Sequence, residues 1–263
     1  MSDKKTKIIA IANQKGGVAK TTTAVNLSAA LAMSGLKVAL IDLDPQGNAS
    51  TGLGIDPQDR VHTIYHVLIN NKNICEATYS TAISNLDIIP SDIDLSAAEV
   101  ELLQFENKDF VLKKALRSLP DNKYDFIIID CPPSLGQLTI NALTAANAIL
   151  IPMQCEFYAL EGLSHLLKSI ELIQGNLNRD LKIFGVVLSM YDKRNRLTEQ
   201  VADDVKACLG DLVFETVIPR NIRITEAPSH GMPVIIYDPN CIGSKAYQEL
   251  AREIIIKEKL VFS

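Results

Sequence analysis

The chain has 263 residues, of which 47% are hydrophobic, and these proportions suit one large α/β domain with a substantial core. Its formal net charge of −5 excludes a global attraction to nucleic acid, although a local basic patch remains compatible with it. The most apolar stretches, 126–129 and 148–151, are far shorter than the ~20 residues of a membrane-spanning helix, and residues 1–7 lack the apolar core of a secretory signal, so we expect a cytoplasmic protein.

The first predicted element is an apolar strand, Lys7–Ala12, which runs into the segment Asn13–Thr22 with the sequence NQKGGVAKTT. In a phosphate-binding loop, glycines let backbone N–H groups curl around phosphates, a lysine reaches the β and γ oxygens, and a hydroxyl ligates Mg²⁺. Lys20 and Thr21 fit the last two roles. A helix predicted over Thr21–Met33 presents its positive N-terminus to the phosphates.

A second lysine, Lys15, stands near the start of this loop, where its ammonium cannot duplicate that of Lys20. Its expected target is another nucleotide, and the alternative is an ordinary solvated loop lysine. The pattern K-G-G-x-x-K-T-T resembles the deviant Walker A box of the ParA/MinD family of ATPases. The resemblance implies that Lys15 crosses a dimer interface to the partner's phosphates. The expected nucleotide-binding residues here are Lys15, Gly16, Gly17, Val18, Ala19, Lys20, Thr21 and Thr22.

One residue departs from this pattern. Ala19 stands where both the ordinary P-loop and the family usually carry glycine. Its methyl group crowds the phosphates or the backbone path, unless the residue has right-handed helical dihedrals, in which alanine costs little. We expect nucleotide binding to survive, while the hydrolysis rate is left open.

The second predicted strand, Lys37–Asp42, continues into the sequence DLDPQGN and places two carboxylates at its carboxyl end, where ligand sites of open α/β sheets gather. Residues two apart on a strand share a side, so Asp42 and Asp44 would both face the Mg²⁺ and γ-phosphate region if the strand persists that far. The alternative is that they end a strand and cap a turn beside Pro45. The resemblance assigns Asp44 to positioning or activating the attacking water, and the strand spacing makes it a candidate metal residue as well.

A third buried strand, Phe126–Asp130, ends in one acid and is followed by Cys131-Pro132-Pro133, a pattern typical of a Walker B segment. We expect Asp130 to hold Mg²⁺ through its waters. The expected metal residues are thus Thr21, Asp44 and Asp130, and the expected catalytic residues are Lys15, Lys20 and Asp44.

Strand and helix patterns alternate along the whole chain and predict a doubly wound, mostly parallel sheet with helices on both faces, the fold of a P-loop NTPase. The other predicted strands are Leu86–Ile89, Ala148–Pro152, Lys182–Ser189 and Glu215–Ile218. The other predicted helices are Ala97–Phe105, Phe110–Leu119, Leu138–Ala146, Leu160–Gln174, Thr198–Leu209 and Ser244–Glu258. We find no linker or repeat, and expect residues 1–263 to form a single ATPase domain without an N-terminal helix-turn-helix domain.

The later segment VIPRNIRITEAPSHG, Val217–Gly231, is similar to the corresponding segment of Soj-like partition proteins. The resemblance places adenine contacts at Pro219 and Asn221, and non-specific DNA contacts at Arg194 and Arg223. Arginine suits phosphate because its fork donates two hydrogen bonds. Acidic neighbours leave an alternative open, in which these arginines form surface salt bridges.

Five scattered cysteines and four histidines show no metal-ligand spacing. Cys131 is expected to be a packing residue, because no base or co-ligand accompanies it.

The resemblance covers nearly the whole chain and implies an ATP-dependent homodimer with Mg²⁺. It further implies that this dimer binds DNA non-specifically and hydrolyses ATP slowly until stimulated by a ParB-like partner. Chromosome or plasmid partition is the expected role, with a nucleoid-associated location. The alternative is a MinD-like ATPase that positions cargo at a membrane surface, but the mixed charges of Glu249–Ser263 favour a helix docked on the domain and no membrane partner. A metabolic P-loop synthetase is a second alternative, for which no acceptor motif is evident.

Overall fold

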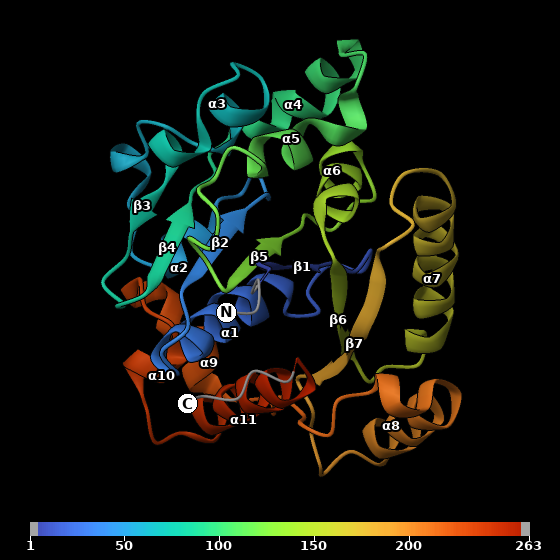
Figure 1. The fold of residues 1–263 in the computed structure, drawn as a ribbon. Helices are drawn as coiled ribbons and strands as arrows, with labels where there is room; N and C mark the ends of the chain where they lie inside the picture. Colours follow the sequence, from blue (N-terminus) through green and yellow to red (C-terminus); the bar gives the residue numbers. More distant parts are fainter. Residues whose placement is uncertain (1–4, 259–263) are drawn as a thin grey trace.

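A computed structural model describes residues 5–258 and contains a seven-stranded sheet in the order β3-β4-β2-β5-β1-β6-β7 (Figure 1). All pairings are parallel except that of β3 with β4. The strands are β1 Lys7–Ile11, β2 Val38–Asp42, β3 Tyr79–Ser80, β4 Leu86–Ile89, β5 Phe126–Asp130, β6 Ala148–Gln154 and β7 Lys182–Ser189. The predicted mostly parallel α/β fold is confirmed.

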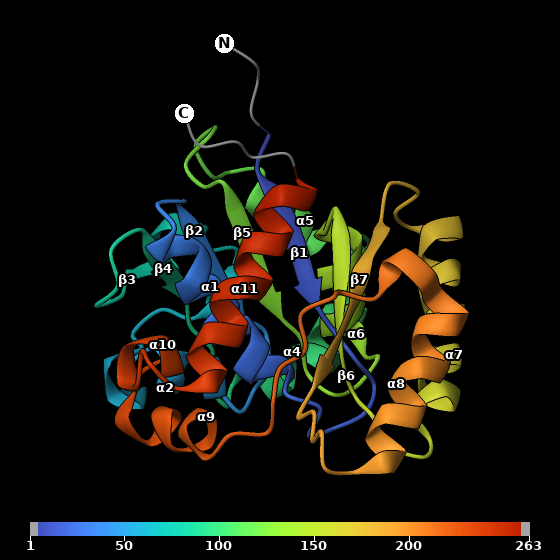
Figure 2. The ribbon, with the colours of Figure 1, turned by 90° about the horizontal axis from the view of Figure 1, so that it is seen from below.

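Helices cover both faces of the sheet (Figures 1 and 2). The α-helices are α1 Lys20–Met33, α2 Asn48–Gly52, α3 Ile64–Leu68, α4 Leu95–Glu101, α5 Val111–Leu116, α6 Gln137–Ala145, α7 Ala159–Asn176, α8 Arg196–Leu209, α9 Ile222–Glu226, α10 Val234–Tyr237 and α11 Ile242–Lys257. Short 3₁₀ turns are η1 Pro57–Asp59, η2 Ile74–Ala77, η3 Leu102–Gln104, η4 Lys108–Phe110, η5 Gly210–Leu212 and η6 Ala227–His230.

Two hydrophobic cores result from the alternation of side chains along the buried strands. In β1, Ala10 contributes to the core under α3 to α8, while Ile9 and Ile11 contribute to the core under α1, α10 and α11. Helix α11 lies alongside α1 (Figure 2). The prediction that the C-terminal helix docks on the domain is therefore confirmed for residues up to 258, and 259–263 lie outside the described residues.

The predicted strand Glu215–Ile218 is wrong. The backbone N–H groups of Glu215 and Thr216 donate to the carboxylate of Glu253 in α11, at 2.9 and 3.1 Å. The segment contacts β7 through the N–H of Phe214, which donates to the carbonyl of Val186, and through the N–H of Ile218, which donates to the carbonyl of Leu188. The N–H of Thr216, which would donate to β7 between those of Phe214 and Ile218 in a parallel ladder, is therefore taken by a side chain.

Further differences concern short elements. The two-residue strand β3 and the short helices α2, α3, α9 and α10 have no counterpart among the predicted elements. They are too short to show a hydrophobic period over several turns. The longer predicted helices lie within a few residues of α1, α4, α5, α6, α7, α8 and α11.

Candidate nucleotide-binding site

The loop between β1 and α1 is fastened to two neighbouring strands. The side chain of Asn13 donates to the carbonyl of Pro152 in β6 at 2.8 Å and accepts from the N–H of Lys15 at 3.0 Å. The hydroxyl of Ser189, at the end of β7, donates to the carbonyl of Val18 at 2.9 Å. These bonds hold a loop with two glycines in one shape, and such preorganisation lowers the entropy cost of binding an anion.

The side chain of Lys20 is turned into this loop. It is 6% exposed, and its ammonium donates to the carbonyl of Lys15 at 3.1 Å. Burial lowers the pKa of Lys20, while the nearby Asp130 and Asp44 act in the opposite direction. The predicted phosphate lysine thus lies inside the loop, at the start of α1 and beside two of the predicted acids.

Ala19 has left-handed backbone dihedrals, with φ 67° and ψ 34°. Ala19 therefore does not have the right-handed dihedrals in which alanine would cost little. Alanine in this conformation carries a strain of about 1–2 kcal/mol relative to glycine. The carbonyl of Ala19 nevertheless accepts the N–H of Thr23 at 2.9 Å and begins the helix. A local strain is built into the loop.

Lys15 lies at the surface, and its ammonium forms an ion pair with Glu156, which follows β6. Both side chains are about half exposed, at 43% and 45%. The second lysine is therefore neither buried in the loop nor a free solvated residue. Its partner in this single chain is a carboxylate 141 positions away, which the sequence pattern had not indicated.

Asp130 ends β5 and is fully buried, and neither carboxylate oxygen meets the geometry of a hydrogen bond within the described residues. Burial, together with Asp42, raises its pKa well above the usual range, and the neighbouring Thr21 hydroxyl and Lys20 ammonium counteract this. A buried carboxylate without a well-formed hydrogen bond, close to a hydroxyl and an ammonium, suits a cation and its waters. Thr21 and Asp130 therefore fit the predicted Mg²⁺ site.

The two aspartates after β2 have different surroundings. Strand β2 ends at Asp42, so Asp44 lies beyond the strand, and the alternation that would place both side chains on one side does not apply. The Asp42 carboxylate accepts the N–H and hydroxyl of Ser50, at 2.8 and 2.7 Å, and burial raises its pKa to about 6. Asp44 is only partly buried and accepts the N–H of Gln46 at 3.0 Å. Asp42 has a structural role at α2, and Asp44 is the more accessible acid, which also acts electrostatically on Lys20 and Asp130.

Arg60 is a buried cation beneath this turn that the sequence reading missed. It is 8% exposed and donates to the carbonyl of Ser91 at 2.9 Å, to the Thr51 hydroxyl at 2.8 Å and to the carbonyl of Ile55 at 2.7 Å. Gly47 packs so closely on it that a Cβ there would lie 2.4 Å from the guanidinium. No short sequence motif indicates Arg60, since its partners come from two segments, one in and after α2 and one at Ser91.

Comparison with known proteins identifies the family. A family model described as an AAA domain matches residues 6–183. The chromosome partitioning protein ParA of Caulobacter vibrioides is 54% identical over 260 residues, covering 98% of this chain and 97% of that protein. The sporulation initiation inhibitor protein Soj of Bacillus subtilis is 53% identical over 248 residues, covering 94% and 98%. The chain belongs to the ParA/Soj family of partition ATPases.

A solved structure extends the likeness to a ligand-bound relative. Cobyrinic acid a,c-diamide synthase from Mycobacterium smegmatis, with bound ADP and magnesium, superposes with a TM-score of 0.84 at 38% identity. It covers 97% of this chain and 96% of that one. The ParA and Soj relatives, at more than 50% identity, are the closer guide to the role of this ParA/Soj-family chain.

The segment shared with Soj-like proteins, Val217–Gly231, comprises the turn before α9, α9 itself and the 3₁₀ turn η6. Pro219 forms an isolated bridge with Tyr191, and the side chain of Asn221 accepts the N–H of Arg223 at 2.8 Å, which caps α9. Asn221 therefore already has one local partner. The predicted adenine contacts of Pro219 and Asn221 stay predictions.

The two candidate DNA arginines both lie at the surface and are paired within this chain. Arg194 donates two hydrogen bonds to Asp192, each 3.0 Å long, and Arg223 pairs with Glu226 at 2.9 Å and with Asp238 at 3.4 Å. The salt-bridge alternative thus describes their state in the single chain, and DNA contact stays a prediction.

Further cations lie near Arg194. A cavity of about 830 Å³ is lined by both Lys193 and Arg194 and, in addition, by Arg220 and Lys245. Lys245 comes from α11, so only the fold brings it to this cluster. Arg220 lies in the segment Val217–Gly231, and its place in this lining is not evident from the sequence.

No helix among residues 5–258 of this family member is long and apolar enough to cross a membrane. The buried Cys131 thiol has a raised pKa because of its burial, which suits the predicted packing role.

Proposed function

We propose that this chain is an ATP-dependent dimerising switch that binds DNA non-specifically and hydrolyses ATP to drive chromosome or plasmid partition with a ParB-like partner. The observation that carries the proposal is the loop with two lysines in different settings. Lys20 is buried in the loop, whereas Lys15 lies at the surface with its ammonium in an exposed ion pair. A surface lysine beside a phosphate loop is available to a second subunit.

Within one subunit, the loop amides and Lys20 would bind the β and γ phosphates of ATP. Thr21 and Asp130 would hold Mg²⁺, which supplies charge neutralisation at the transferring phosphoryl group, and the magnesium in the M. smegmatis relative supports this assignment. Asp44 is proposed to orient the attacking water. Lys15 from the second subunit would add positive charge to the transition state.

Hydrolysis is then slow in the isolated chain, because the site is complete only in the dimer. The dimer also doubles the number of cations offered to DNA, and such contacts add up to a salt-dependent, sequence-independent affinity. ATP thereby sets how long the chain stays on DNA. A nucleoid-associated, cytoplasmic location follows from this proposal.

The test is retention of the purified protein on DNA with ATP, with ADP and without nucleotide, over a salt series. We expect retention with ATP only, with the logarithm of affinity falling linearly against the logarithm of salt. Equal retention under all three conditions would refute the switch. Binding to anionic vesicles instead of DNA would support the MinD-like alternative, in which the segment after Lys257 acts at a membrane surface.

A further inference from the structure

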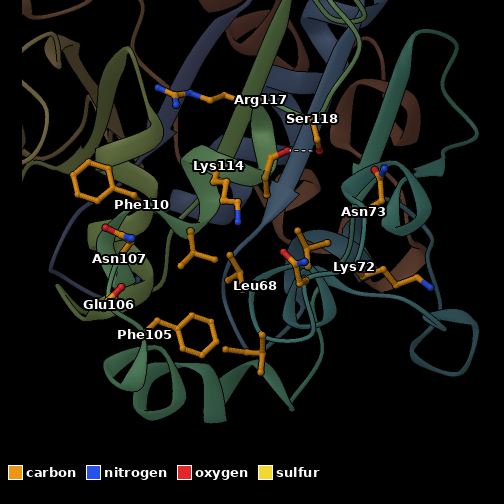
Figure 3. A pocket seen from close by; sticks show the side chains of 15 residues that line it. Leu68, Lys72, Asn73, Phe105, Glu106, Asn107, Phe110, Lys114, Arg117 and Ser118 are labelled. Atoms are coloured by element: carbon orange, nitrogen blue, oxygen red, sulfur yellow. Dashed lines mark hydrogen bonds between the residues drawn. The ribbon is translucent and has the colours of Figure 1, made fainter.

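A cavity of about 780 Å³ is lined by α3 and the loop after it and by the segment from Phe105, just after η3, to Ser118, just after α5 (Figure 3). Its lining contains none of the P-loop residues, strand-end aspartates or candidate DNA arginines. Its floor is apolar and includes the buried Val67 and Leu68. Phe105 and Phe110 line it as well, and each is 37% exposed. We call this cavity the α3–α5 groove.

The groove carries positive charge on a chain whose net charge is −5. Lys72, Lys114 and Arg117 line it, against one acid, Glu106. Lys72 already pairs with Glu76 at 3.0 Å. Lys114 and Arg117 are exposed and form no ion pair or hydrogen bond within residues 5–258. Two uncompensated cations therefore border an apolar floor.

The wall of the groove is held in place from behind. The carbonyl of Lys108, in η4, accepts hydrogen bonds from the side chains of Gln137 and Asn141 in α6, at 3.2 and 2.7 Å. The side chain of Asn141 also accepts the N–H of Leu112 in α5 at 3.1 Å. A groove whose wall is fixed in this way is preformed, and preformed sites lose less entropy when they bind.

We propose that the α3–α5 groove docks an acidic amphipathic peptide segment of another protein. Apolar side chains of the segment would pack on Phe105, Phe110 and the floor, while its carboxylates would pair with Lys114 and Arg117. Nucleic acid fits less well, because the two free cations flank apolar side chains and an acid, and offer no continuous row for phosphates. The proposal does not depend on the ATP switch.

The experiment selects ligands from a phage-displayed library of random 12-residue peptides on the purified full chain. The charge-reversed variant Lys114→Glu with Arg117→Glu serves for counter-selection. We expect the enriched peptides to combine Asp or Glu with Leu, Ile or Phe. Their affinity, measured by fluorescence anisotropy, should fall about ten-fold or more on the charge-reversed variant and also on Phe105→Ser.

The matched control is Lys168→Glu with Arg179→Glu, which makes the same charge change at two exposed positions, one in α7 and one just after it. Affinity on this control should stay within about two-fold of the original value, because distant exposed charges are screened. Retained binding of ATP shows that each variant is folded. Phe105→Ser adds an uncharged variant, so the result does not depend on charge reversal alone.

Three outcomes would overturn the proposal. The first is a selection in which no peptide distinguishes the chain from the charge-reversed variant. The second is displacement of the selected peptides by a single-stranded oligonucleotide, dT20, at comparable concentration. The third is that self-association of the chain prevents the selected peptides from binding, because the groove would then be a contact between copies of this chain.

Discussion

The P-loop of this chain contains a left-handed alanine, and its cost can be measured. Ala19→Gly should stabilise the protein by about 1 kcal/mol, because glycine adopts φ 67° without a clash of Cβ. The free energy of unfolding from urea denaturation checks this. The same substitution at Ala97, an exposed residue in α4, is the control and should destabilise by about 0.5–1 kcal/mol. An Ala19→Gly variant less stable than the original chain would contradict the assigned strain.

Gly47 offers the converse case, because it is a glycine that the site requires. Its φ is 63°, and a Cβ would lie 2.4 Å from the Arg60 guanidinium and 3.1 Å from the carbonyl of Ser91. Gly47→Ala should destabilise by about 1–3 kcal/mol, through backbone strain and displacement of the buried Arg60. It should also slow ATP turnover, since the turn that carries Asp44 must shift.

Urea denaturation and steady-state ATP turnover test the Gly47 variant. The control is Gly162→Ala in α7, where a Cβ would meet nothing within 4 Å. That control should be neutral or stabilise by up to about 1 kcal/mol, since alanine favours helix. If the two alanine variants were equally stable, the close packing of Gly47 on Arg60 would be without consequence.

At the scale of elements, the turn between β7 and α8 holds a candidate DNA contact in a self-paired state. Asp192 accepts both hydrogen bonds of Arg194, and these bonds lower its pKa to about 2. A carboxyl with a lowered pKa is ionised well above that value, so its pairing is lost only as the pH falls through about 2. Between pH 6 and 8, this pair should add no pH dependence to DNA affinity.

Asp192→Asn should therefore release Arg194 at neutral pH. We expect DNA affinity in the presence of ATP to rise about two- to five-fold at low salt, with the gain shrinking as salt increases. Fluorescence anisotropy with labelled duplex DNA measures it. Asp204→Asn on α8 removes the same charge from an exposed position without freeing an arginine, so a gain of equal size there would show a general charge effect only.

The segment before α9 shows where prediction from sequence reaches its limit. Buried strands such as Phe126–Asp130 could be predicted because a short apolar run bounded by polar turns is typical of a strand buried in a parallel sheet. Glu215–Ile218 is also predicted as a strand, yet the N–H groups of Glu215 and Thr216 donate to Glu253, which is 38 positions from Glu215. Local pattern cannot show which distant side chain competes for a backbone donor.

For the molecule as a whole, the topology followed from the alternation of strands and helices, whereas the detail of the site did not. The loop residues and Asp130 were found because motifs keep them adjacent in sequence or at a strand end. Arg60, Glu156 and Lys245 act through neighbours contributed by other segments, so only the folded chain brings them to the site. The left-handed dihedrals of Ala19 likewise depend on how the loop is fastened to β6 and β7.

The pairing of Lys15 with Glu156 leads to a prediction about assembly. If Lys15 serves the partner's nucleotide, the ion pair within the single chain must open before two subunits associate. An exposed pair of this kind is worth about 0–1 kcal/mol, so Glu156→Gln should favour the ATP-bound dimer by up to about five-fold. Lys15→Ala should disfavour that dimer, because it removes the cation itself.

Analytical ultracentrifugation at saturating Mg·ATP, with Asp44→Ala added to slow turnover, measures both effects on the dimer dissociation constant. Glu161→Gln is the control, because it neutralises another exposed acid in the first turn of α7 without touching Lys15. A dissociation constant that rises in Glu156→Gln would mean that Glu156 is needed in the dimer itself, and the ion pair would then not restrain assembly. A chain that stays monomeric in every variant would instead refute the role given to Lys15.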